Sequence, residues 1–157
     1  MNKTAFITLI AAGAQESMRA TGVPASFTIA QAALESAWGE SGLTKSAMNL
    51  FGIKADKGWK GPTVTIPTRE YVDGKWVTVP ALWRKYLSWA ECLTDHAQFF
   101  IVNKRYAPAF KHTDNAEQFA IAIADAGYAT DPQYSAKVIA TIRSNNLTTF
   151  DKLEKKA

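Results

Sequence analysis

Glu35 lies near the end of residues 25–38, a segment that carries no other charged residue. In a helix, Gln31 would lie one turn before Glu35 and Trp38 about one turn after it. A carboxyl group beside an indole and away from water keeps its proton to higher pH, and a general acid needs that proton to protonate a leaving oxygen. The alternative is a glutamate on the exposed face of an amphipathic helix, and the helix alone does not decide between them.

A second group of residues suits the wall of a carbohydrate site. Asn49 and Phe51 are followed by closely spaced glycines and by Trp59. An asparagine can form hydrogen bonds with a sugar, while aromatic rings stack on the apolar face of the sugar. The same stretch is also compatible with an ordinary turn in which Leu50 and Phe51 are buried.

Other kinds of site find little support in the sequence. The only histidines are His96 and His112, without the HExxH spacing of a zinc site, and the single cysteine, Cys92, falls on the apolar side of a candidate helix. Glycine-rich phosphate loops are absent, and the basic residues are scattered instead of following one recognition helix. We therefore expect no metal, no cofactor and no nucleic-acid partner.

The elements that position these residues are mainly helices. Apolar residues recur with helical spacing in the following segments: 4–18, 24–37, 88–100, 115–126 and 131–142. In the first of them Thr4 is the expected N-cap. In the second, a core stripe of Ala30, Ala33, Leu34 and Ala37 is expected. Gly127 should stop the fourth segment, and Pro132 should open the fifth.

Between residues 52 and 86 the hydrophobic period changes to two, which is typical of strands. Asp73-Gly74 is a strong signal for a two-residue hairpin turn. The resulting register pairs residue 72 with 75, 71 with 76 and Glu70 with Val77. Alternation then places Glu70 on the same face as Ile66, Val72, Val77 and Val79, so that a carboxylate interrupts an apolar row. Helices with one small hairpin lobe predict a mainly α, α+β fold.

Size and composition agree with one folded domain. The chain has 157 residues, of which 47% are hydrophobic and 20% charged, and this balance excludes a disordered or fibrous chain. The longest apolar run, 5–14, is too short to span a membrane. The small residues at 12–14 imitate a signal-peptide cleavage site, but helical spacing continues through them, so we expect no signal peptide. The net charge of +4 suits an anionic partner such as a nucleic acid, a membrane surface or a cell wall.

Taken together, several motifs resemble those of glycoside hydrolase family 73, the glucosaminidase domains of flagellar peptidoglycan hydrolases, autolysins and phage lysins. They occur in the family's order and the resemblance covers residues 4–147. The motifs are AQAALESAWG at 30–39, NLFGIK at 49–54, TREY at 68–71 and YATDPQY at 128–134. The resemblance implies a lysozyme-like fold, in which a helical lobe and a small β-lobe flank a glycan groove.

The resemblance also assigns roles to residues. Glu35 matches the catalytic acid of the family's AQxxLES motif, Glu70 the second acidic residue on the β-lobe, and Tyr128 the essential tyrosine that lines the groove. Ala37 departs from the glycine that relatives often carry before the tryptophan. Tyr134 is expected to pack at the start of the last helix and to have a weaker part in the site. The residues expected to contact substrate are Gln31, Trp38, Asn49, Phe51, Trp59 and Tyr134.

The implied activity is hydrolysis of the β-1,4 bond on the reducing side of N-acetylglucosamine in peptidoglycan, with glycan strands as partner. Glu35 would protonate the glycosidic oxygen. Either Glu70 then activates a water, which inverts the anomeric centre, or the substrate's acetamido oxygen attacks with help from Tyr128, which retains it. A muramidase, a lytic transglycosylase and a non-catalytic wall-binding module are the alternatives.

For the whole chain we expect one catalytic domain over residues 1–150, a charged tail over 151–157, and a monomer. A basic catalytic domain without a signal or wall-binding repeats suggests a phage or prophage endolysin. Such a protein is made in the host cytoplasm and acts on the cell wall. A domain of a larger bacterial autolysin would have the same sequence features.

Overall fold

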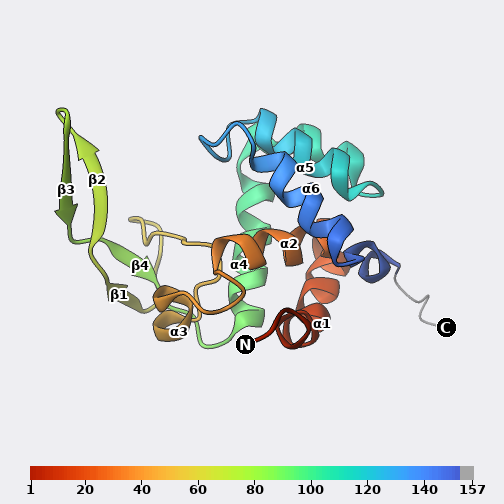
Figure 1. Ribbon diagram of the computed structural model, residues 1–157, viewed down its shortest axis with the longest axis horizontal. Coiled ribbons are helices and arrows are strands. Elements are labelled where there is room, and N and C mark those ends of the chain that lie inside the picture. Colours follow the sequence, from red (N-terminus) through yellow and green to blue (C-terminus); the bar gives the residue numbers. More distant parts are fainter. Residues whose placement is uncertain (153–157) are drawn as a thin grey trace.

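A computed structural model describes residues 1–152 and confirms a mainly helical fold with a small β-lobe (Figure 1). The helices are α1 (Lys3–Thr21), α2 (Ala25–Glu35), α3 (Gly42–Ala47), α4 (Trp89–Val102), α5 (Ala116–Asp125) and α6 (Tyr134–Ser144), with 3-10 helices η1 (Lys104–His112) and η2 (Leu147–Asp151). The strands are β1 (Thr63–Thr65), β2 (Thr68–Val72), β3 (Lys75–Val79) and β4 (Leu82–Arg84). The helices gather on one side, and the β2–β3 hairpin projects from the other.

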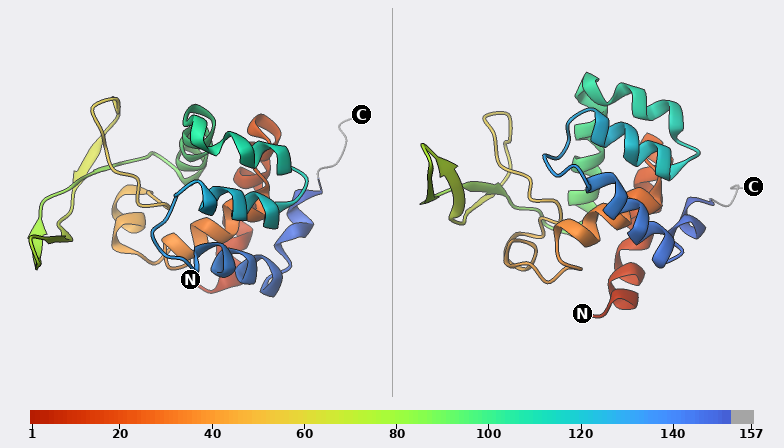
Figure 2. Two further views of the ribbon diagram at one scale, coloured as in Figure 1. Left: turned by 90° about the horizontal axis from the view of Figure 1, so that it is seen from above. Right: turned by 45° about the horizontal axis from the view of Figure 1, so that its top comes forward.

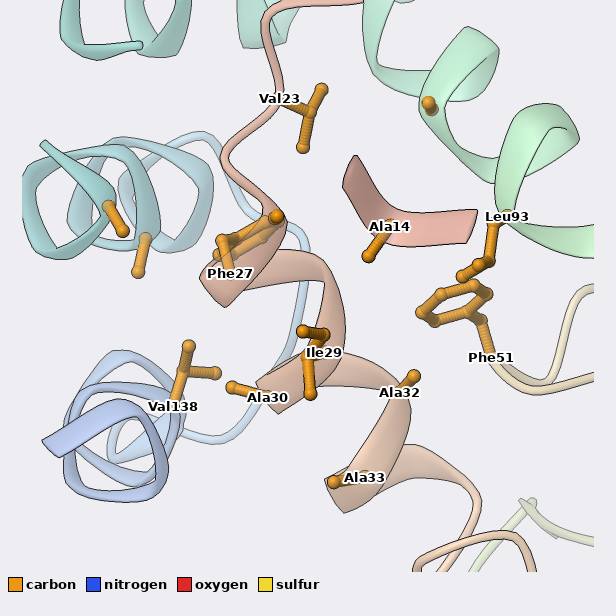
Figure 3. Close-up of a cluster of buried hydrophobic side chains, with 14 of the residues drawn as sticks. Ala14, Val23, Phe27, Ile29, Ala30, Ala32, Ala33, Phe51, Leu93 and Val138 are labelled. Carbon is orange, nitrogen blue, oxygen red and sulfur yellow. The ribbon is translucent and has the colours of Figure 1, made fainter. Parts of the chain in front are cut away.

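Helix α2 is the centre of the helical lobe, and nine of its eleven residues are buried. Small residues such as Ala30, Ala32 and Ala33 let the neighbouring helices approach its backbone, while Phe27 and Ile29 fill the space between them (Figure 3). Helices α1, α5, α6 and η2 all pack against it. The expected core stripe is wrong at its end, because α2 stops at Glu35 and both Leu34 and Ala37 are exposed.

The first helix runs without interruption through the small residues at 12–14, as its spacing predicts. Its N-cap is Asn2 and not Thr4, because the Asn2 side chain accepts a hydrogen bond from the Ala5 amide at 2.7 Å. Within residues 1–152, no helix has the length and hydropathy that crossing a membrane requires.

Asp151 has a structural role that contradicts the expectation of a tail beginning at this residue. Its carboxyl group accepts hydrogen bonds from the Ser26 amide at 2.7 Å and from the Ser26 hydroxyl at 2.5 Å. These bonds satisfy a donor in the first turn of α2, which has no side-chain cap of its own. The rest of the expected tail, 153–157, lies outside the described residues.

The β-lobe confirms the hairpin and its register. Glu70 pairs with Val77, residue 71 with 76, and 72 with 75, while Asp73 and Gly74 both adopt positive φ, as a tight hairpin turn requires. The segment 63–65 is not part of this hairpin, because β1 pairs with β4 in a second two-stranded sheet. Val72 and Val77 are exposed, so the face that carries Glu70 is not a core face. The hairpin therefore extends from the β1–β4 sheet into solvent (Figure 2).

Helices α4 and α5 begin directly after Ser88 and Asn115, where the expected helical segments start, and the structure shows that both side chains act as N-caps. Cys92 is buried on the inner side of α4, where burial raises the pKa of its thiol to about 12. The last long helix begins at Tyr134, two residues after the proline expected to open it. Helices α3 and η1 had no clear sequence signal, because they are short or follow a 3-10 pattern around Pro108.

Replacing Asp151 should destabilise the fold. In Asp151→Ala, the Ser26 amide and hydroxyl lose their acceptor, and we expect the free energy of unfolding to fall by about 1–2 kcal/mol. Urea denaturation followed by circular dichroism measures this loss. The control is Asp125→Ala, which removes an exposed carboxylate and should change stability by less than about 0.5 kcal/mol. Equal stability of the two variants would show that Asp151 does not anchor α2.

Candidate active site

The chain reverses direction immediately after Glu35, which is the last residue of α2. Ala37, Trp38 and Gly39 all have positive φ, a conformation that is uncommon for residues other than glycine. The Ser36 hydroxyl holds this turn by donating to the Ala32 carbonyl and accepting from the Gly39 amide. The positive φ at position 37 explains why a glycine suits this position. The turn leaves Glu35 at the end of a rigid helix.

Glu35 opens into a groove of about 400 Å³ between the helical lobe and the start of the β-lobe. A cavity of this size is typical of ligand sites. The groove is lined by Glu35, Phe51, Gly52, Ile53, Lys54, Asp56, Arg84, His96, Phe99, Tyr128 and Ala129. Of these, the sequence had predicted only Glu35, Phe51 and Tyr128 as site residues.

The surroundings of Glu35 favour its protonated form. Although its outer edge is open to the groove, the walls around the carboxyl group exclude much of the water, and this desolvation raises its pKa to about 7. A hydrogen bond from Tyr134 acts in the opposite direction with a smaller effect. The carboxyl group also lies at the C-terminal end of α2, where the unpaired carbonyls disfavour a negative charge. A glutamate with these properties can act as a general acid at neutral pH.

Trp38 does not provide the apolar surroundings of Glu35, contrary to expectation. Because the helix ends at Glu35, Trp38 leaves the helical path, and its ring packs edge-on against Phe6 with Lys3 above it. The ring is absent from the groove lining. Desolvation comes from residues distant in sequence instead.

Tyr134 contacts the candidate acid directly, a larger part than expected. Its hydroxyl donates to Glu35 Oε1 at 3.3 Å and accepts from Gln31 Nε2 at 2.7 Å. Tyr134 is 8% exposed and Gln31 is wholly buried, so the two residues lie behind the acid and do not face the groove. The expectation that Gln31 contacts substrate is therefore wrong.

Tyr128 lines the groove, but it is also part of an aromatic cluster, which the sequence did not reveal. Its ring packs against Phe100 and Tyr134 at centroid distances of 5.5 Å, and its hydroxyl lies 3.1 Å from His96 Nε2. Burial lowers the pKa of His96 to about 3, so this histidine is neutral and stacks on Phe51 at 3.7 Å. The phenol of Tyr128 also has a raised pKa because of burial, and it remains a hydrogen-bond donor at neutral pH.

Glu70, the expected second carboxylate, lies on the hairpin and is not among the residues that line the groove. Its Oε1 atom pairs with Lys54 Nζ at 3.4 Å, and Lys54 does line the groove. The hairpin face that carries Glu70 is therefore the one nearer to the groove.

Asn49 and Trp59 both help to hold the groove wall together. The buried side chain of Asn49 does not face a ligand, which corrects that expectation, whereas the substrate contact expected of the half-buried Trp59 stays a prediction. Asn49 is 1% exposed, and its side chain bonds to the backbone of Ile53 and to the Arg84 carbonyl. The Trp59 indole donates to the Pro62 carbonyl, and the ring packs against Tyr86. Neither residue lines the groove.

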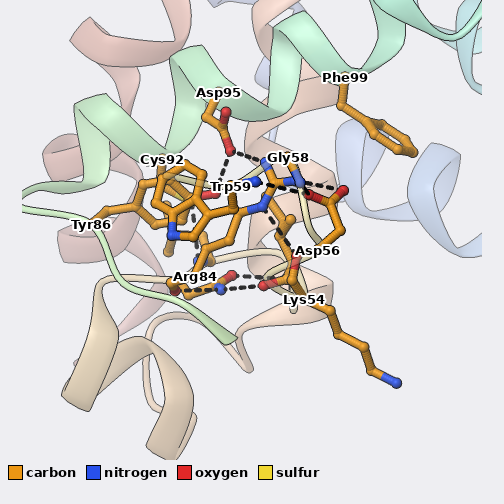
Figure 4. Close-up of polar contacts among 12 residues, drawn as sticks. Lys54, Asp56, Gly58, Trp59, Arg84, Tyr86, Cys92, Asp95 and Phe99 are labelled. Carbon is orange, nitrogen blue, oxygen red and sulfur yellow. Dashed lines mark hydrogen bonds and ion pairs between the residues drawn. The ribbon is translucent and has the colours of Figure 1, made fainter. Parts of the chain in front are cut away.

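Arg84 is the centre of the polar contacts beside the groove (Figure 4). Its guanidinium group donates to Asp95 at 2.8 Å, to Asp56 at 3.2 Å and to the Lys54 carbonyl at 3.1 Å, and it lies over the Trp59 ring. These contacts join strand β4 to helix α4 and to the loop at residues 54–59. Its position at the end of a short strand carried no sequence signal, because its partners are distant in the chain.

No group of three or more histidine, cysteine or acidic side chains that could hold a metal ion is found in residues 1–152. The nearby acidic groups Asp56 and Asp95 are engaged by Arg84. The arrangement offers one protonated acid, hydrogen-bonding phenols and a cation at the groove wall.

The raised pKa of Glu35 should make stability depend on pH in a defined way. Below about pH 4.5 the carboxyl is protonated in both the folded and the unfolded state, and between about pH 4.5 and 7 only the folded state keeps the proton. Protonation thus stabilises the fold at low pH, and this stabilisation is lost as the pH rises through about 7. The melting temperature of Glu35→Gln relative to wild type should therefore rise between about pH 4.5 and 7, and this difference should stay constant above about pH 7.

Differential scanning calorimetry of both proteins between pH 4 and 8.5 measures this difference. Glu117→Gln is the control: the hydrogen bond from Arg143 lowers the pKa of Glu117, so its titration window lies below about pH 4.5 and its difference from wild type should stay constant above that pH. A constant difference between wild type and Glu35→Gln over the whole range would contradict the raised pKa.

Comparison with known proteins supports one family. Residues 11–147 match the glucosaminidase family, described as mannosyl-glycoprotein endo-beta-N-acetylglucosaminidase. The peptidoglycan hydrolase FlgJ of Vibrio cholerae is 42% identical over 142 residues, which are 88% of this chain and 42% of FlgJ. The exo-glucosaminidase LytG of Bacillus subtilis is 41% identical over 133 residues, which are 82% of this chain and 46% of LytG. The chain thus spans less than half the length of these curated relatives.

The fold gives the same answer. The crystal structure of the catalytic domain of the autolysin Auto from Listeria monocytogenes superposes with a TM-score of 0.86 at 35% identity, covering 95% of this chain and 87% of that domain. The lysozyme-like fold expected from the motifs is thereby confirmed. Sequence match, fold and a groove with a protonated glutamate agree, and the chain belongs to the glucosaminidase family, glycoside hydrolase family 73.

Proposed function

We propose that this chain is a peptidoglycan hydrolase that cleaves the β-1,4 bond between N-acetylglucosamine and N-acetylmuramic acid as an endo-acting glucosaminidase. The observation that carries the proposal is the position of Glu35, which opens into the groove with a pKa of about 7. Support for the substrate comes from the relatives, since FlgJ is named a peptidoglycan hydrolase and LytG an exo-glucosaminidase, and the endo action follows the description of the matching family.

In the first step, Glu35 donates its proton to the glycosidic oxygen while the bond to the anomeric carbon breaks. The transition state has oxocarbenium character, and proton donation prevents an alkoxide from having to leave. Glu35 is then a carboxylate, and the hydroxyl of Tyr134 stabilises its new charge. The apolar walls favour the protonated acid before this step, and the hydrogen bond supports the ionised product afterwards.

The second step follows one of two routes. If Glu70 acts as the base, it removes a proton from a water on the opposite side of the sugar, and Lys54 keeps its carboxylate oriented toward the groove. If the substrate's acetamido oxygen instead attacks the anomeric carbon as the glycosidic bond breaks, an oxazolinium ion forms, and Tyr128 is the groove hydroxyl available to orient this group. Water then opens this ring at the anomeric carbon, and the Glu35 carboxylate takes the proton of that water. Glu70 lies outside the groove lining, and this position favours the acetamido route.

The proposed site of action is the cell wall, where the polymer is found, and the net charge of +4 suits an anionic wall. Origin in a phage or prophage remains a prediction, as does the monomeric state. The second candidate function is that of a muramidase, which cuts the other glycosidic linkage of peptidoglycan and would require a similar acid.

Product analysis tests the reaction and the bond together. Wild-type protein should release fragments with N-acetylglucosamine at the new reducing end, identified by mass spectrometry after borohydride reduction, and its activity should fall as the pH rises above about 7. Glu35→Gln should lose at least about 100-fold in rate while it remains folded, because only the proton donor is removed. N-acetylmuramic acid at the new end would indicate a muramidase, and a fully active Glu35→Gln would refute the acid.

Substitutions at Glu70 and Tyr128 distinguish the two routes. In the acetamido route, Glu70→Gln should reduce turnover by less than about 10-fold, whereas Tyr128→Phe should reduce it by about 100-fold, because only the latter removes a groove hydroxyl. A thiazoline-type inhibitor should then bind. A loss of several orders of magnitude in Glu70→Gln, with partial recovery in azide, would establish Glu70 as the base. Initial rates on solubilised glycan strands provide the measurement.

A further inference from the structure

Gln31 is wholly buried, and its carbonyl oxygen has no hydrogen-bond partner among residues 1–152. A buried carbonyl without a partner is unfavourable, and such groups are rare in folded proteins. The amide nitrogen of the same side chain makes one short bond, 2.7 Å, to the Tyr134 hydroxyl. The amide therefore satisfies Tyr134 while its own carbonyl remains without a partner.

The direction of this bond determines what Tyr134 can do next. A phenol has a single proton, and the Tyr134 oxygen already accepts from Gln31. The proton of Tyr134 is thus available for Glu35 Oε1, 3.3 Å away. If the amide were reversed, its carbonyl would take the proton of Tyr134, the amide nitrogen of Gln31 would have no partner among the described residues, and Glu35 would lose its donor.

The consequence appears at the acid itself. An oxygen that accepts a hydrogen bond from Tyr134 cannot carry a proton directed along the same line, so the acidic proton of Glu35 belongs on Oε2. No hydrogen bond to Oε2 is found among the described residues, and Glu35 lines the groove. An acid with its proton on the free oxygen presents that proton to an incoming glycosidic oxygen.

We propose that Gln31 is a positioning residue that, through Tyr134, keeps the acidic proton of Glu35 on Oε2. This inference rests on the proposed function, because it assigns a role within proton transfer to a glycoside. It replaces the expectation that Gln31 contacts substrate. Gln31 lies one helical turn before Glu35 in α2, so a single rigid helix holds both the acid and the amide that directs its donor.

The other charged and titratable groups around Glu35 do not depend on this relay. They are Lys54, Asp56, Arg84, His96 and Tyr128. Lys54 pairs with Glu70, while Asp56 pairs with Arg84, and neither pair involves Gln31. A change at Gln31 therefore leaves these groups in place.

The test is a double-mutant cycle with Gln31→Met and Tyr134→Phe, each of which removes hydrogen bonding while nearly preserving volume. The first readout is the pKa of Glu35, followed by ¹³C NMR of carboxyl-labelled glutamate. Each single variant should raise this pKa by about half a unit or more. In Tyr134→Phe the carboxylate loses its donor, and in Gln31→Met the Tyr134 oxygen no longer accepts from an amide and can accept the proton of Glu35 instead. The double variant should match Tyr134→Phe alone, since Gln31 acts only through Tyr134.

The second readout is hydrolysis of a soluble, uncross-linked glycan strand. Each single variant should lower kcat by about 10-fold or more and change KM by less than about twofold, and the double variant should again equal Tyr134→Phe. Additive effects of the two substitutions, an unchanged pKa of Glu35 in Gln31→Met, or a raised KM with normal kcat would each overturn the proposal. If Gln31→Met does not melt cooperatively, Gln31→Leu takes its place in the cycle.

Two matched controls accompany the cycle. Gln15→Met removes an amide whose single hydrogen bond within residues 1–152 goes to the Phe150 carbonyl, and Tyr106→Phe removes a buried hydroxyl that has no partner in the same part of the chain. Neither should change the pKa of Glu35 or kcat. Because the NMR titration needs no hydrolysis, wild-type protein that cleaves no glycan would contradict the proposed function while the titration still decides the role of Gln31.

Discussion

A proton must stay on Glu35 at neutral pH, and much of the architecture serves this requirement. A carboxyl group in water loses its proton well below pH 7, so the chain has to withdraw water from one side of the group and leave the other side open. Because α2 is buried on nearly all sides, water is withdrawn from one side of the carboxyl group. Because the helix ends at Glu35, the other side stays open. The negative end of the helix dipole acts in the same direction.

The wall opposite the helices depends on a single cation. Arg84 makes contacts with helix α4 through Asp95 and with the loop before β1 through Asp56, while Tyr86 also donates to Asp95. Such charge-assisted bonds are directional, so they fix the angle at which β4 leaves the helical lobe. The groove therefore has one wall built by apolar packing and another built by polar contacts, which place Lys54 beside the site.

Local signals in the sequence predicted local features well. The Asp73-Gly74 turn fixed the hairpin register, and Ser88 and Asn115 marked the starts of their helices, because each of these features depends on neighbouring residues. Features that depend on distant partners could not be predicted in this way. Asn49 lies in a motif that suits sugar binding, yet its side-chain amide donates hydrogen bonds to backbone carbonyls that folding brings near.

The relative importance of Tyr128 and Tyr134 was similarly hidden. The motif that contains both does not reveal which phenol lies against Glu35, since that depends on how α6 packs on α2. Glu35 could be predicted as the candidate acid from the sequence, because an uncharged helix with one terminal glutamate is a local pattern. The physical source of its pKa was not, because the walls come from four separate segments.

The β2–β3 hairpin has few contacts outside itself, and its valines and aromatic residues are largely exposed. In hydrogen-exchange terms it is a unit of low local stability, whose amides open at a small free-energy cost while those of α2 exchange only on global unfolding. Glu70 moves with this unit, whereas Glu35 moves with the core. The separation between the two carboxyl groups is thus not one fixed distance in the free protein but a distribution set by the motion of the hairpin.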